Sequence, residues 1–104
     1  MTFSSRLGPD PTDMFRRLRA RPASSWAHGG REAAMRAALQ QLADLAADAS
    51  GRSRRVVPDV GVGAQVDQLA VLFADAGTAG VPGETADGLL TGLAGQLGVR
   101  LGGQ

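Results

Sequence analysis

The stretch REAAMRAALQQLADLAADA, residues 31–49, decides the fold expected for this chain. Successive residues of an α-helix are rotated by about 100°, so side chains on one face recur every three or four positions. Six apolar side chains lie within about 60° of Leu42 on a helical projection: Met35, Ala38, Leu39, Leu45, Ala46 and Ala49. Glu32, Arg36, Gln40 and Asp44 lie outside this stripe. The stretch therefore predicts a long amphipathic helix.

A shorter helix is predicted before it. Asp10-Pro11 places an acid at the N-cap and a proline at the first helical position, and Pro22 stops the helix. Met14, Phe15 and Leu18 share one sector of this helix, while its arginines cover the remainder.

Two further helices are predicted after a loop rich in glycine, serine and proline. The third helix is expected over Val60–Ala76 with Asp59 as its cap, and the fourth over Pro82–Leu97. We therefore predict an all-α fold, a small bundle of three to four amphipathic helices. Residues 10–101 are expected to form a single helical domain, with a flexible N-terminal arm over 1–9 and a flexible tail over 102–104.

Composition excludes several kinds of chemistry. The chain has no cysteine, which rules out disulfides and thiol catalysis. The single histidine, His28, lies in a connector near Ser24 and Ser25, without the further ligands of a metal site or the geometry of a catalytic triad. We expect no enzyme activity, no metal and no cofactor.

The genome and compartment can also be inferred. Lys, Ile, Asn and Tyr are absent, whereas Ala, Gly and Arg abound, as expected for a GC-rich genome of actinobacterial type. Codon bias alone then explains why every basic residue besides the histidine is arginine. No apolar run is long enough for a membrane span, and we expect a cytoplasmic protein.

Charge is divided unevenly along the chain. Residues 1–58 hold ten arginines and five acids, while residues 59–104 hold Arg100 and five acids. This division favours docking of the basic half on the protein's own acidic half, or on an acidic partner. The predicted partner-binding face is Arg16, Arg17, Arg19 and Arg21.

Trp26 follows these arginines and has two interpretations. An exposed tryptophan beside arginines is typical of a protein–protein hot spot. Alternatively, Trp26 folds down as a lid on the small core. Gly88 and Gly92, four residues apart, predict a close helix contact, within the fold or across a homodimer.

The alternative function is DNA binding by a small regulator that uses the basic half. Two arginine clusters could flank a phosphate backbone: Arg16 and Arg17 in the first helix, and Arg52, Arg54 and Arg55 in the loop. The clusters have no aromatic residues interleaved for base stacking.

The segment AGVPGETADGLL, residues 79–90, resembles the turn and second helix of repressor-type helix-turn-helix proteins. The resemblance rests on Ala79, Gly80, Val81, Thr85 and Leu90. The positions that would face DNA differ from that family, since they hold Pro82, Gly83, Glu84, Asp87 and Gly88. We interpret the segment as a corner between two helices of the bundle.

The function we predict is a non-catalytic helical interaction or adaptor module that self-associates as a homodimer.

Overall fold

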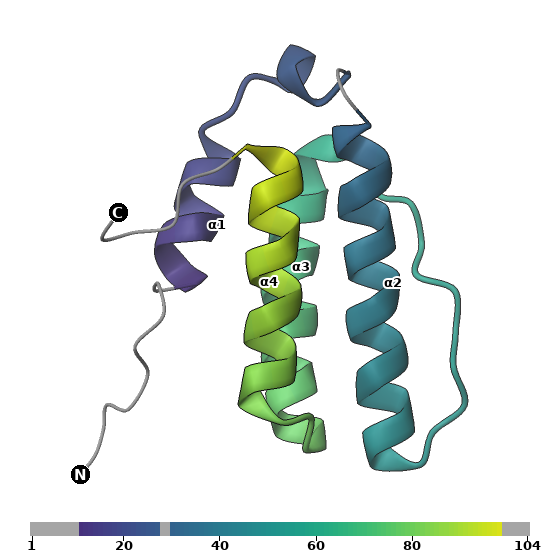
Figure 1. Ribbon diagram of the computed structural model, residues 1–104. Coiled ribbons are helices and arrows are strands. Elements are labelled where there is room, and N and C mark those ends of the chain that lie inside the picture. The colour runs from purple at the N-terminus through teal and green to yellow at the C-terminus, as the bar shows by residue number, and fades with distance from the viewer. Residues whose placement is uncertain (1–10, 28–29, 99–104) are drawn as a thin grey trace, which may run out of the picture.

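The computed structural model describes residues 11–27 and 30–98, and every regular element in that part of the chain is a helix. Figure 1 shows the four α-helices and one short 3₁₀ helix: α1 (Pro11–Arg19), η1 (Ala23–Ala27), α2 (Arg31–Ser50), α3 (Val62–Ala79) and α4 (Gly83–Leu97). The all-α prediction is confirmed. The predicted arm over 1–9 and tail over 102–104 lie outside the described residues.

Two glycines end the long helices in the same way. Gly51 after α2 and Gly80 after α3 have φ angles of 75° and 102°, in the left-handed region where a side chain is strained. The residue after each glycine donates its N–H back into the helix, from Arg52 to Ala47 at 2.8 Å and from Val81 to Ala76 at 2.9 Å. These bonds satisfy carbonyl groups that the helix end leaves open.

The start of α3 lies two residues later than predicted. Gly61 has a φ of 83°, and its N–H donates to Asp59 Oδ1 at 3.0 Å. The prediction that Asp59 caps the third helix is therefore wrong, because Gly61 is the N-cap and Asp59 accepts a bond within the turn before the helix. Val60 stays outside α3 with 46% of its surface exposed.

An extended crossover loop, residues 51–61, makes α2 and α3 parallel. In Figure 1 the chain descends through α2, returns along its outer side, and descends again through α3 before α4 ascends. A helix of 20 residues is about 30 Å long. Eleven extended residues reach about 35 Å, so the loop has the length to return the chain to the start of α2.

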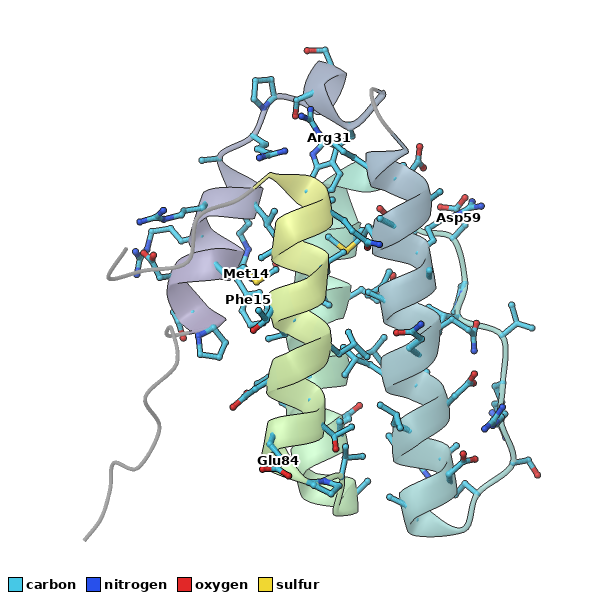
Figure 2. The ribbon with its side chains drawn as sticks, viewed as in Figure 1. Met14, Phe15, Arg31, Asp59 and Glu84 are labelled. Atoms are coloured by element: carbon cyan, nitrogen blue, oxygen red, sulfur yellow. The ribbon has the colours of Figure 1, made fainter. Side chains whose placement is uncertain are left out.

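The core lies where the apolar stripes of the four α-helices meet. Its largest fully buried apolar side chains come from every α-helix: Met14, Leu18, Met35, Leu39, Leu42, Leu69 and Leu97. Helix α1 packs on α3, where the rings of Phe15 and Phe73 meet edge to face with centroids 6.3 Å apart. Figure 2 shows Met14 and Phe15 on the inner side of α1. Within the described residues, no helix combines the length and apolar character needed to cross a membrane.

Candidate interaction surfaces

The arginine face of α1 is partly neutralised by carboxylates. Arg16 Nη1 lies 2.7 Å from Asp13 Oδ1, and Arg17 Nε lies 3.0 Å from Asp13 Oδ2. Arg19 reaches α3 and donates from Nε to Asp67 Oδ1 at 2.9 Å. The side chains of Arg16, Arg17 and Arg19 are nevertheless 69%, 45% and 48% exposed, so they remain accessible to a partner.

Within the described residues, ion pairs join the basic half of the chain to its acidic half. Arg19 pairs with Asp67, and Arg36 of α2 pairs with Asp59 of the crossover loop at 3.1 Å. The uneven charge favoured docking of the basic half on the chain's own acidic half or on an acidic partner. These ion pairs are contacts of the first kind.

Trp26 is buried, so its interpretation as an exposed hot spot is wrong. The side chain is 4% exposed and belongs to the hydrophobic core, as the lid interpretation predicted. The 3₁₀ helix that carries it is tied to α2 by Arg31, whose Nη1 donates to the Ser25 carbonyl at 2.8 Å. Figure 2 shows Arg31 between η1 and the start of α2. Burial of the large indole is worth more here than exposure to a partner.

The arginines of the crossover loop lie far from those of α1. Figure 1 shows the loop beyond α2 on one edge of the body and α1 beyond α4 on the other. Arg52 Nε donates to Ser50 Oγ at 2.8 Å, and Arg54 Nη2 lies 2.7 Å from Asp48 Oδ2. The hydrogen bond from Arg54 holds the pKa of Asp48 below its usual range. The two arginine clusters of the DNA hypothesis, Arg16 and Arg17 on one side and Arg52, Arg54 and Arg55 on the other, thus form no continuous basic surface.

The corner between α3 and α4 is formed by Gly80 and Pro82, as the interpretation of residues 79–90 expected. Glu84 occupies the first turn of α4 and is exposed, as Figure 2 shows at the lower end of the helix. A carboxylate at this position opposes the approach of a phosphate backbone.

Gly88 and Gly92 make no close helix contact within the fold, so that part of the prediction is wrong. Both are exposed, and a Cβ built on either one would meet no atom within 4 Å. They instead line a depression of about 290 Å³ between α2 and α4. Its walls are Ala34, Ala37, Ala38, Gln41, Gly88, Leu89, Gly92, Leu93 and Gln96, none of which carries a charge.

This depression continues toward the end of α2. Gln41 and Leu89 also line a second depression, of about 430 Å³, together with Asp44, Leu45, Asp48, Arg54 and Thr85. The two depressions form one groove along the antiparallel helices, which we call the α2–α4 groove. Its first part is neutral and its second part ends at the Arg54–Asp48 ion pair.

A pocket under the crossover loop was not predicted from the sequence. It is lined by Arg36, Leu39, Gln40, Val56, Val57, Pro58, Asp59 and Gln65 and has a volume of about 410 Å³. Gln65 is 1% exposed. The sequence did contain a sign that Gln65 is buried. Gln65 lies four residues before Leu69 and therefore falls within the apolar face of the third helix.

No group within residues 11–27 and 30–98 gathers three carboxylate or histidine side chains as a metal site would require. His28 lies outside the described residues. No known protein family, no curated protein and no solved structure matches this chain.

Proposed function

We propose that the protein is a non-catalytic interaction module that self-associates through the neutral part of the α2–α4 groove. The observation that carries the proposal is the open space over Gly88 and Gly92, within an exposed surface lined by small or uncharged side chains. Glycines four residues apart on a helix let a second helix approach closely, because no Cβ keeps the backbones apart.

Self-association is favoured over a foreign partner by the charge pattern. In a two-fold contact each residue of a patch faces the same patch on the other copy, so charged patches repel themselves. The nine residues that line the neutral part of the groove avoid this cost. In the proposed dimer, α4 of one copy lies over the groove of the other.

The arginine face of α1 is the proposed contact for an acidic protein partner. Arg16, Arg17 and Arg19 belong to α1, on the edge of the body remote from the crossover loop, and the half-buried Arg21 follows the helix. Exposed charges of this kind accelerate encounter with an oppositely charged surface more than they strengthen the final complex. The contact would therefore weaken as salt concentration rises.

The test of self-association uses two matched variants. Gly92→Gln places a bulky, uncharged side chain in the groove, whereas Gly77→Gln places the same side chain at an exposed position of α3, outside both depressions of the groove. Neither position has an atom within 4 Å of a built Cβ, so both variants should fold. Their masses are measured by sedimentation between about 1 μM and about 1 mM, where weak dimers dissociate.

We expect the wild type and Gly77→Gln to form dimers as concentration rises and Gly92→Gln to remain monomeric. A wild type that is monomeric over the whole range would refute the proposal. Equal association of the wild type and Gly92→Gln would also refute it, because it would place the contact elsewhere.

The DNA alternative has its own measurement. Binding of a fluorescent duplex at low salt, with an affinity that falls steeply as salt is added, would favour a DNA-binding regulator. Absence of any shift at low salt would remove that alternative. The acidic start of α4 and the separation of the arginine clusters weigh against it.

A further inference from the structure

The side chain of Gln65 is buried without hydrogen-bond partners. It is 1% exposed, and among the described residues neither its Oε1 nor its Nε2 has a partner. Buried amides are almost always hydrogen-bonded, because an unpaired donor or acceptor loses its interaction with water and gains nothing in return. A Gln65 amide with both atoms unpaired among the described residues leaves a donor and an acceptor that a molecule from outside this chain can satisfy.

The pocket that Gln65 lines has walls held in position by another glutamine. Gln40 of α2 donates from Nε2 to the Arg55 carbonyl at 2.9 Å and accepts from the Val57 N–H at 3.0 Å through Oε1. These two bonds fasten the crossover loop over the pocket. Ligand pockets commonly measure about 300–1,000 Å³ and combine apolar walls with a few placed polar groups. The 410 Å³ pocket, with Leu39, Val57 and Pro58 among its walls, fits this description.

The rim of the pocket offers further contacts. Val56 is 87% exposed, which is unusual for a large apolar side chain next to a cavity, and a bound molecule would cover it. Arg36 and Asp59 form their ion pair at the same rim and have side chains 55% exposed. The pocket can therefore hold an apolar or planar body against the loop. Because both polar atoms of the Gln65 amide are closed to solvent, that side chain must turn toward the pocket to meet a polar edge of the bound body.

The amide of Gln65 restricts what that edge can be. Its Oε1 accepts and its Nε2 donates, side by side in one plane. An anion would satisfy the donor alone, and a cation would satisfy the acceptor alone. Both atoms are satisfied by a partner that presents a donor beside an acceptor, as a primary carboxamide or a lactam-type nucleobase edge does. We propose that this pocket binds a small molecule through a carboxamide or lactam edge paired with Gln65. The proposal does not depend on self-association, since none of its residues lines the α2–α4 groove.

The experiment is a titration of the full chain, labelled with ¹⁵N, by two separate probes: nicotinamide, which carries a carboxamide, and uracil, which carries a lactam edge. The resonances of the Gln65 side-chain NH₂ and of the Val57 amide report binding, up to a probe concentration of about 10 mM, which detects a Kd near 1 mM. Saturation by nicotinamide alone assigns a carboxamide ligand, whereas saturation by uracil assigns a lactam-type nucleobase edge.

Two variants at the site and one control establish the role of Gln65. Gln65→Met keeps the length of the side chain without its polar atoms, and Gln65→Glu keeps its shape without the donor. Each should weaken the binding probe at least tenfold, read from the Val57 amide, with the folded spectrum retained. Thr78→Met, at an exposed position of α3 that lines neither this pocket nor the α2–α4 groove, should bind as the wild type does.

Three outcomes would overturn the proposal. One is the absence of a saturable shift with every probe. Another is equal binding by Gln65→Met and the wild type. The last is a crystal structure of the full chain grown with the probes in which ordered water alone meets the Gln65 amide.

Discussion

Arg19 of α1 and Asp67 of α3 meet across the interface of the two helices, with Arg19 Nε 2.9 Å and Nη2 2.7 Å from the same Asp67 oxygen. The two side chains are 48% and 72% exposed. The same two helices are also joined by an apolar contact, because Phe15 of α1 is 8% exposed and contacts Phe73 of α3. The ion pair and the apolar contact involve different residues, so their contributions can be separated by mutation.

The apolar contact should account for most of the stability of α1 docking. Asp67→Asn should lower the free energy of unfolding by less than about 1 kcal/mol, because exposed ion pairs contribute little. Phe15→Ala should lower it by about 3–5 kcal/mol, because it leaves a cavity against α3. Urea unfolding monitored by circular dichroism measures both values. A larger loss in Asp67→Asn than in Phe15→Ala would contradict this account.

Two glycines of α3 should respond to alanine in opposite directions. Gly77 has ordinary helical geometry and open space around it, so Gly77→Ala should raise stability by about 0.5–1 kcal/mol through helix propensity. Gly80 has a φ of 102°, so Gly80→Ala should lower stability by more than about 1 kcal/mol. Thermal unfolding of the two variants beside the wild type checks the signs. Stabilisation by both would show that the turn after α3 tolerates a side chain.

The crossover loop should loosen when Gln40 is replaced. Gln40→Leu removes the donor to Arg55 and the acceptor of the Val57 N–H, and we expect a loss of about 1–3 kcal/mol. Hydrogen exchange at the Val57 amide should accelerate more than exchange in the middle of α2. Ala33→Leu changes an exposed side chain of α2 that lines neither the pocket nor the α2–α4 groove and serves as the control. Unchanged protection of Val57 in Gln40→Leu would contradict the role of Gln40.

The Asp48–Arg54 pair should make stability depend on pH at the acidic end. The hydrogen bond from Arg54 lowers the pKa of Asp48 in the folded state, so the unfolded chain takes up a proton first as the pH falls. The contribution is present above the ordinary aspartate pKa of about 3.9 and disappears as the pH falls through the lower folded value. Carboxyl ¹³C titration should give Asp48 a midpoint below that of free aspartate.

Arg54→Gln should return the Asp48 midpoint to its ordinary range. Arg52→Gln is the matched control, because Arg52 donates to Ser50 rather than to Asp48. A depressed midpoint that persists in Arg54→Gln would show that another group lowers the pKa.

Periodicity predicted the helices well because each apolar stripe has a single core to face. Helix α2 begins at Arg31 as predicted and ends one residue later, at Ser50. Met14, Phe15 and Leu18 are buried together on α1, as their shared sector indicated. Within α2, however, Ala47 is buried and Ala49 is exposed, the reverse of what the stripe suggested. The position of α3, a tertiary contact, decides between two small side chains of similar propensity.

Other features depend on relationships that one sequence does not contain. Whether Trp26 covers the core depends on how η1 folds back over α2. The hydrogen bond from Arg31 to the Ser25 carbonyl holds η1 there, and it crosses a turn whose sequence has no helical periodicity. The open space over Gly88 and Gly92 depends on how α4 lies against α2, which is a tertiary relationship. The pocket at Gln65 requires the crossover loop to lie against α2, which is visible in the hydrogen bonds of Gln40 and not in local patterning.

The extended crossover loop has a consequence for how the bundle could change during evolution. A tight turn after Ser50 would reverse the chain at once and bring the next helix back antiparallel to α2, exchanging which ends of the helices are neighbours. Since the loop must run back along α2 from Gly51 to Arg36, where Asp59 forms its ion pair, shortening it to a tight turn would remove the parallel arrangement rather than merely shorten a surface segment. The direction of α3 is thus determined by chain reach, and drift in loop length is a route from this topology to a different one.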